Sequence, residues 1–597
     1  MRFSKKLWRK INVPLVAIPF AGLILAWGAM DWAQEQKAGV PSPAVRVTVR
    51  LVLADAVVTD KDGKTITGLG AQDFTVLEDG KPQKVTIVSF EQPAETARAL
   101  RSQRATLPPN VTTNRPEYRM PLGVPVILLL DALNTQLRDQ ARVRMEMLKY
   151  LDTQLQPGQP VAVYTLGRSL RLLQDFTDDT TLVKAAVESF NPAVSLELQL
   201  SDVDARLPRL SGARADAAGV RAPNRDAAVF ISRMADFYNE QANLAIDMRV
   251  GMTLTTFRAI AQAVAGLPGR KNLIWVSGSF PIATYTRIIK YSADGDNDPN
   301  RVAFNELYED RVRETTSALT DAQVAVYPVD ARGLVGQLLG GAENQGVSGA
   351  GTLVGGAEYA QNLQLASGAL QESQATMKQV AGETGGKVFI NQNDLEHAVA
   401  LSMVDGASYY LLGYSPEGKP DGKFHKIEVK VNRPGVTVRA RHGYYALTSA
   451  DDAKTTKQRE GEIGIAMQIG TPAATGVTFD ARVVPPPPAA KMKVGIDFIV
   501  DPYTISAEDA GGGNRRLAVE FHAAAYGSDR KIAGQKDVAI KPTLKSEDFT
   551  RIQQQGLPYH LDLELPPAHY TLRLGVVDQR SGFIGTADMP LALEGNK

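Results

Sequence analysis

Two hydrophobic patterns divide this chain into regions with different predicted structures. Between residues 121 and 415, continuous apolar runs alternate with stretches of helical periodicity. The clearest run, residues 124–130, carries no charged side chain and ends at Asp131. Such a run is typical of a strand buried on both faces, as in a parallel sheet covered by helices. The alternation therefore predicts a doubly wound α/β domain with a mostly parallel, Rossmann-like sheet.

A second pattern, with apolar residues at every other position, flanks this domain on both sides. It occupies residues 44–93, where turn signals separate the runs, and predicts a small β domain there. It returns at residues 489–597, where several short alternating runs predict a β-sandwich. The predicted architecture is thus an α/β domain flanked by N-terminal and C-terminal all-β, sandwich-like domains.

The remaining segments are interpreted as connections and insertions. In chain order, we expect a linker at 94–120, a β-hairpin extension at 416–445, and a second linker at 446–488 that ends in a polyproline spacer. Two insertions interrupt the α/β domain, which spans 121–415. Residues 191–245 are polar with a helix near 227–243, and residues 333–370 are Gly-rich, which favours a mobile loop.

The N-terminus predicts export. Five basic residues precede the apolar stretch 13–29, so residues 1–34 are interpreted as a signal peptide or, if uncleaved, an N-terminal anchor. Pro14, Pro19 and the short apolar length favour cleavage. The expected location is periplasmic or secreted, with membrane contact only through this segment. The chain has no cysteine, which excludes disulfides, thiol catalysis and a lipid-anchored cysteine.

The balance of basic and acidic residues argues against some classes of binding partner. The 66 Lys+Arg against 65 Asp+Glu give a formal charge of +1. A nearly neutral chain offers no electrostatic case for nucleic acid or for an anionic surface.

Several phrases together resemble one protein family. They are Ile66-Thr-Gly-Leu69, Asp73-Phe-Thr-Val-Leu-Glu-Asp-Gly80, Leu128-Leu-Leu-Asp-Ala-Leu-Asn-Thr135, Pro268-Gly-Arg-Lys-Asn-Leu-Ile-Trp-Val-Ser-Gly-Ser-Phe-Pro281 and Tyr410-Leu-Leu-Gly-Tyr414. In this combination, the span from Val45 to Tyr445 resembles the bacterial VWFA-related proteins, which are exported and built around a von Willebrand factor type A domain. The final β domain lies outside the resemblance.

The resemblance implies a metal-ion-dependent adhesion site, in which an Asp-x-Ser-x-Ser loop is joined by a Thr and a second Asp. Asp131 matches the first Asp, Thr135 stands at the second Ser, and Thr253 matches the Thr of a loop that opens a helix. Two positions depart from the pattern, because Leu133 replaces the first Ser and Ser277 replaces the last Asp.

These departures weaken the implied metal site. Mg²⁺ or Mn²⁺ prefers several oxygen ligands and favours carboxylates, and only one carboxylate remains. One hypothesis is a degenerate divalent site made by Asp131, Thr135 and Thr253. The alternative is that Asp131 caps a helix or binds nearby amides, with the threonines as N-caps. Further candidates for the same strand-end rim are Asn134, Ser277, Ser279, Asp294, Asp296 and Asp298.

The catalytic alternatives are weaker. Ser277 and Ser279 follow a predicted strand, but no Gly-x-Ser-x-Gly elbow surrounds them. The acidic run 294–298 resembles the start of a calcium loop, yet Pro299 stands where Gly is required, which favours a solvated turn. The adhesion-type site that the resemblance implies takes a partner carboxylate as its last metal ligand. We therefore expect a non-enzymatic binding or adhesion protein that recognises a protein or peptide partner through the strand-end rim. The alternatives are a metal-independent envelope scaffold or assembly factor and, third, a hydrolase.

Overall fold

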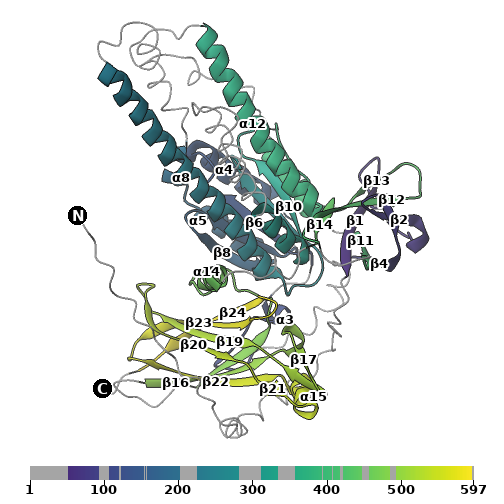
Figure 1. Ribbon diagram of the computed structural model, residues 1–597, viewed down its shortest axis with the longest axis vertical. Coiled ribbons are helices and arrows are strands. Elements are labelled where there is room, and N and C mark those ends of the chain that lie inside the picture. The colour runs from purple at the N-terminus through teal and green to yellow at the C-terminus, as the bar shows by residue number, and fades with distance from the viewer. Residues whose placement is uncertain are drawn as a thin grey trace.

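The computed structural model (Figure 1) describes most of the chain beyond its N-terminal segment. The described ranges are 51–92, 107–119, 123–201 with breaks at 154 and 156–157, 225–280, 311–333, 356–405 with a break at 393, 408–416, 421–446, 456–484 and 492–594. The predicted export segment and the candidates Asp294, Asp296 and Asp298 lie outside these ranges. Within them, no helix combines the length and apolarity needed to cross a membrane.

The predicted doubly wound sheet is present at the centre of the chain. Its strands lie in the order β10-β9-β6-β7-β8, parallel except for the antiparallel edge strand β8. Their bounds are β6 (Val126–Asp131), β7 (Val161–Leu166), β8 (Leu170–Thr177), β9 (Lys271–Ser277) and β10 (Val324–Asp330). The chain order reverses between β6 and β9, which makes their carboxyl ends the topological switch point, where such sheets bind ligands.

Helices cover both faces of this sheet, which explains the unbroken apolar run of β6. One core contains Val126, Leu128 and Leu130, and the opposite core contains Ile127 and Leu129. The first face is covered by α4 (Leu137–Thr153), α5 (Thr180–Ser189) and α13 (Leu395–Val404). The second is covered by α8 (Arg225–Val264), which contacts α6 (Leu196–Ser201), and by α12 (Gly356–Thr384). Both α8 and α12 extend well beyond the sheet (Figure 1).

The two long helices correct the predicted insertions. Residues 227–243 and the segment around Gly251 belong to one continuous 40-residue helix, α8, so no loop precedes Thr253. Glycine inside a helix costs about 1 kcal/mol, but the stripe Ile246, Val250, Leu254 and Phe257 packs on the sheet and outweighs that cost. Likewise, residues 356–370 of the expected mobile loop are helical in α12.

The N-terminal β domain is larger than predicted, because it draws strands from both sides of the α/β domain. Two four-stranded sheets, β13-β1-β11-β4 and β14-β12-β2-β3, enclose a common core. Their strands are β1 (Val52–Asp60), β2 (Phe74–Glu78), β3 (Lys81–Gln83), β4 (Val85–Glu91), β11 (Tyr409–Tyr414), β12 (Phe424–Val431), β13 (Val436–Arg439) and β14 (Gly443–Tyr445), with the short helix η3 (Ala71–Asp73) before β2.

This arrangement corrects two predicted boundaries. Strand β11 was expected to close the α/β domain, but it pairs antiparallel with β1 and β4. Residues 416–445 were expected to be a hairpin extension, but β12 pairs with β2 and β13 pairs with β1. The alternation within a short strand shows which of its faces is buried, but it does not show which other strand it pairs with. Here the paired strands lie more than 300 residues apart in the sequence.

The C-terminal sandwich also includes residues that were predicted to be linkers. Its main sheets are β22-β16-β15-β5 and β20-β19-β23-β24, beside a small sheet β17-β18-β21. Strand β5 (Val111–Thr113) comes from the first predicted linker, and α14 (Thr456–Ala466) and β15 (Phe479–Val484) from the second. The proline run lies outside the described residues. Strands β15 and β16 (Met492–Val500) on either side of it pair with each other, so it does not separate two domains.

The remaining elements complete this domain. They are α3 (Pro116–Arg119), η6 (Pro502–Thr504), β17 (Glu508–Gly511), β18 (Asn514–Arg516), β19 (Val519–Tyr526), β20 (Ile532–Ile540), β21 (Thr543–Leu544), α15 (Ser546–Gln555), β22 (Leu557–Leu565), β23 (His569–Asp578) and β24 (Ile584–Ala592). The buried side chains of the two main sheets form one continuous apolar core.

Candidate functional site

The sequence-predicted candidates that the structure describes meet at the switch point of the central sheet. Asp131 ends β6 and Ser277 ends the neighbouring strand β9. The loops after these strands carry Asn134, Thr135 and Ser279, and α8 brings Thr253 to the same place. Parallel strands present their carboxyl ends at one edge, which is why residues far apart in sequence converge here.

The Asp131 carboxylate accepts four hydrogen bonds from protein donors. Its Oδ1 accepts from the Asn134 backbone N–H at 2.9 Å. Its Oδ2 accepts from Asn134 Nδ2 at 2.9 Å, from Trp275 Nε1 at 3.0 Å and from Ser277 Oγ at 2.8 Å. Each carboxylate oxygen offers about two acceptor positions, so the three bonds saturate Oδ2, whereas Oδ1 accepts one of these bonds. Burial raises the pKa of Asp131, and the hydrogen bonds from Asn134, Ser277 and Trp275 oppose that rise.

Asn134 links this carboxylate to α8. Its Nδ2 also donates to Thr253 Oγ1 at 2.9 Å, and its Oδ1 accepts from Arg249 Nε at 3.0 Å. Arg249 is only 2% exposed and also donates through Nη2 to Ser279 Oγ at 3.1 Å. A buried guanidinium therefore lies one side chain away from the buried carboxylate. The four residues Asp131, Asn134, Arg249 and Thr253 are called the latch below.

A second set of bonds joins the two strand-end loops directly. Thr135 Oγ1 accepts from the Gly278 N–H at 2.9 Å, and Ser279 Oγ donates to the Asn134 carbonyl at 3.2 Å. A Cβ on Gly278 would lie 3.0 Å from the Asn134 carbonyl oxygen and 3.1 Å from Thr135 Cα, so a side chain here would press the two loops apart by a few tenths of an ångström.

These contacts decide how each predicted metal ligand fits Mg²⁺ or Mn²⁺. The Asp131 oxygens face N–H and O–H donors, and the Thr253 hydroxyl donates to the Arg249 carbonyl at 2.8 Å. Leu133, at the first Ser position, is 1% exposed in the apolar core. A divalent cation would have to displace Asn134 and approach a guanidinium. The donor set as arranged does not fit the ion, and it matches the alternative in which Asp131 binds nearby amides. Thr253 lies inside α8 and is not an N-cap.

The described rim candidates are less exposed to solvent than residues that contact a partner need to be. Asn134 and Thr135 are each 2% exposed, and Ser277 is 0% exposed. Ser279 is partly exposed, and the neighbouring Gln136 and Leu137 are exposed. The residues predicted for the rim therefore form an internal network beside a small accessible edge.

Sequence reasoning missed two members of this network. Trp275 is a core residue of β9, as expected, but its indole N–H also donates to Asp131. Arg249 gave one usable signal, since it is a basic residue four positions before Thr253 on the helix face that packs on the sheet.

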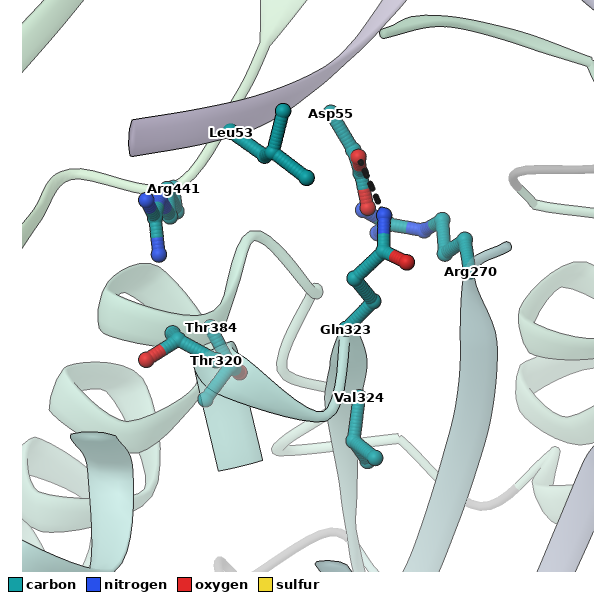
Figure 2. A pocket seen from close by; sticks show the side chains of 8 residues that line it. All are labelled: Leu53, Asp55, Arg270, Thr320, Gln323, Val324, Thr384 and Arg441. Carbon is teal, nitrogen blue, oxygen red and sulfur yellow. Dashed lines mark hydrogen bonds and ion pairs between the residues drawn. The ribbon is translucent and has the colours of Figure 1, made fainter. Parts of the chain in front are cut away.

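Another polar cluster joins the central domain to the N-terminal sandwich (Figure 2). Arg270 Nη1 lies 3.9 Å from Asp55 Oδ2, and Gln323 and Arg441 line the same cavity of about 20 Å³. Burial raises the pKa of the Asp55 carboxyl, and the charge of Arg270 opposes the rise. Next to Arg270, burial lowers the pKa of Lys271 to about 7. This joint positions the two domains against each other.

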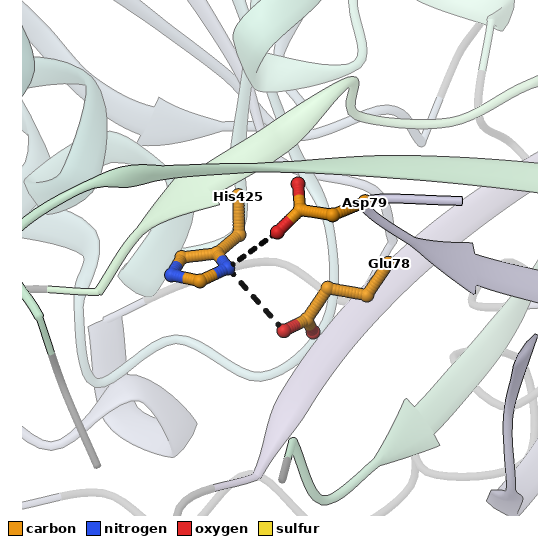
Figure 3. A group of neighbouring side chains, drawn as sticks. All are labelled: Glu78, Asp79 and His425. Carbon is orange, nitrogen blue, oxygen red and sulfur yellow. Dashed lines mark hydrogen bonds and ion pairs between the residues drawn. The ribbon is translucent and has the colours of Figure 1, made fainter. Parts of the chain in front are cut away.

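Among the described residues, one group of acidic and histidine side chains could hold a metal ion. It consists of Glu78, Asp79 and His425, whose ligand atoms all lie within 4.8 Å of one another (Figure 3). It lies in the N-terminal sandwich, and no sequence pattern pointed to it.

Comparisons with known proteins add little to this geometry. No family model matches the chain, and no curated protein sequence does. An aerotolerance-related membrane protein from Bacteroides fragilis is 10% identical, with 48% of this chain and 98% of that chain covered at a TM-score of 0.22. Conserved hypothetical protein BatB from Bacteroides thetaiotaomicron is 12% identical, covering 47% and 97% at a TM-score of 0.18. Scores this low transfer neither fold nor function.

Proposed function

We propose that this chain is an exported, non-enzymatic scaffold or binding protein that works without a metal ion at its strand-end site. The observation that supports this most directly is the Asp131 carboxylate, which is 2% exposed and bonded to four protein donors. A site of the adhesion type needs an open metal position that a partner carboxylate completes. In this chain, the latch fills that place with Asn134 and Arg249.

The latch has a structural role in this proposal. It ties the loop after β6 to α8, and the bonds of Ser277 and Gly278 tie the same loop to β9. Because the network is internal, it fixes the shape of the strand-end edge instead of contacting a partner. The two β domains then act as spacers or additional contact surfaces.

The same edge supports a second candidate function, which is metal-independent recognition of a protein or peptide. Leu137, at the start of α4, is 46% exposed directly after the latch loop. Leu137 thus offers a partner an exposed apolar contact on the first turn of a helix, next to a loop that buried hydrogen bonds hold in place.

Catalysis is not part of the proposal. The single hydroxyl proton of Ser277 is shared between two acceptors, Asp131 Oδ2 at 2.8 Å and the Ser279 carbonyl at 2.9 Å, and the side chain is 0% exposed. A serine nucleophile needs an adjacent base and access to substrate, and this hydroxyl is used as a donor inside the network.

Capture of envelope partners with and without EDTA tests the proposal. We expect the same partners in both conditions, and we expect Leu137→Asp to lose them. Leu182→Asp is the matched control, because Leu182 is 47% exposed on α5, away from the strand-end edge. Partners released by EDTA and restored by Mg²⁺, with loss in Asp131→Ala, would instead establish metal-dependent adhesion.

A further inference from the structure

The turn between β2 and β3 places two acidic side chains next to a histidine of β12. Asp79 and Gly80 have φ values of +49° and +80°, and Glu78 pairs with Lys81 across them. Two consecutive positive φ values in a two-residue loop are typical of a type I′ hairpin turn, which favours Asp-Gly. The turn is fixed against β12 by the Lys426 N–H, which donates to Asp79 Oδ1 at 2.9 Å, while Asp79 Oδ2 faces His425.

We propose that Glu78, Asp79 and His425 bind a divalent transition-metal ion of the Zn²⁺ class. His425 Nδ1 lies 2.9 Å from Asp79 Oδ2 and 3.5 Å from Glu78 Oε1 (Figure 3). A tetrahedral ion with bonds of about 2.0 Å holds its ligand atoms about 3.3 Å apart. The two separations from His425 lie on either side of this value, and all three ligand atoms lie within 4.8 Å of one another, so side-chain rotations can bring them around one ion.

Each of the three ligands has a second partner, which for Asp79 is the Lys426 N–H described above. His425 Nε2 lies 3.0 Å from Asp421 Oδ1 and can donate its proton there, so that Nδ1, which faces Asp79 Oδ2, can bind the ion once it gives up its proton. Glu78 is 7% exposed, and its Oε2 accepts from Tyr414 Oη at 2.6 Å. The histidine ring also stacks on Tyr444, with ring centroids 5.5 Å apart. Such outer partners orient ligands in metal sites and increase their affinity.

The ligand types select the ion. Imidazole nitrogen suits Zn²⁺ and its neighbours in the first transition series, whereas Mg²⁺ and Ca²⁺ prefer oxygen ligands alone. One histidine and two carboxylates leave a fourth position for water or a partner group, and the Asp79 side chain on that side is 49% exposed.

The bound ion would join the two segments that enclose the α/β domain. Glu78 and Asp79 precede that domain in the chain and His425 follows it, so one ion would link both halves of the N-terminal sandwich. This site lies in a different domain from the latch and does not depend on the proposed function.

Calorimetric titration of the full-length, EDTA-dialysed protein with ZnCl₂ tests this site. We expect one tight site in the wild type and a dissociation constant raised at least about 100-fold in His425→Ala, because a direct ligand matters at least as much as an outer one. Asp421→Ala removes only the outer partner and is expected to weaken binding about 10- to 100-fold. Asp79→Asn keeps the turn chemistry and separates loss of a ligand from loss of the fold.

His560→Ala is the matched control. His560 also contacts two carboxylates, Asp497 at 2.6 Å and Asp562 at 3.1 Å, but through opposite ring nitrogens, so the two carboxylates cannot share one ion with the ring. It should bind Zn²⁺ like the wild type. Co²⁺ in place of Zn²⁺ should give the intense visible absorption of a four-coordinate ion, and His425→Ala should lose it. Equal Zn²⁺ binding by the wild type, His425→Ala and Asp79→Asn, or no binding by the wild type, would overturn the proposal and leave a protonated histidine between carboxylates.

Discussion

Replacing Asp131 with alanine tests whether the strand-end carboxylate stabilises the fold. The substitution removes the acceptor for four buried donors. Two of these donors keep another acceptor, since Asn134 Nδ2 still bonds Thr253 and Ser277 Oγ still bonds the Ser279 carbonyl. The Asn134 N–H and the Trp275 indole N–H lose their acceptor.

The expected loss in the free energy of unfolding follows from the two donors that are left without an acceptor. A buried donor left without a partner costs about 1–3 kcal/mol, so two of them cost about 2–6 kcal/mol. The matched control is Asp152→Ala, because Asp152 is 53% exposed in its ion pair with Lys184. An exposed ion pair contributes about 0–1 kcal/mol, so this variant should remain close to the wild type.

Urea unfolding followed by tryptophan fluorescence measures the effect. Trp275 is the single tryptophan after residue 34, and it lies against Asp131, so the chain from residue 35 onward gives a signal from this site alone. We expect Asp131→Ala to lower the unfolding midpoint clearly and Asp152→Ala to leave it nearly unchanged. An Asp131→Ala midpoint equal to the wild type would refute the reasoning, because it would mean that the four hydrogen bonds do not stabilise the central domain.

Three further predictions concern residues around the same domain. Arg249→Met should reduce the free energy of unfolding by about 1–3 kcal/mol, because the buried Asn134 Oδ1 loses its donor; a midpoint unchanged in urea would contradict this. Gly278→Ala should destabilise by about 1–3 kcal/mol through overpacking against the Asn134 carbonyl, whereas Gly461→Ala, with open space around it, should not. The folded-state pKa of Lys271 is about 7 and the unfolded value about 10.4, so between these pH values the unfolded chain binds more protons. The stability of the wild type should therefore rise relative to Lys271→Met by up to about 1.4 kcal/mol per pH unit across this window, and denaturant midpoints that keep a constant difference from pH 7 to 9 would exclude the assignment.

The central sheet was predictable because burial on both faces leaves a direct mark on the sequence. Residues 126–130 are apolar without exception and feed two cores, and Asp131 marks the strand end. The β domains were only partly predictable. The alternation found their strands, but β1 pairs with β11 and β5 pairs with β15, in both cases across more than 350 residues. Local patterns do not encode such distant partners.

The contacts within the candidate site were likewise only partly predictable from the sequence. The sequence brought Asp131, Thr135, Thr253 and Ser277 together through resemblance, and the structure places them at one strand-end edge. Their chemistry depends on Asn134, which turns its amide toward Asp131, and on a guanidinium from a helix more than 100 residues away. The orientation of an amide and the reach of a distant side chain are properties of packing, which no spacing in the sequence records.

The Asp131 carboxylate is bonded to protein donors, and we propose that it does not hold a metal ion. Anomalous diffraction from crystals of the wild-type protein soaked in MnCl₂ tests this directly, because it locates each bound ion. We predict no manganese peak within bonding distance, about 2.2 Å, of either Asp131 oxygen. A peak there, with Asn134 and Arg249 turned away, would contradict the latch and restore a metal-dependent adhesion site.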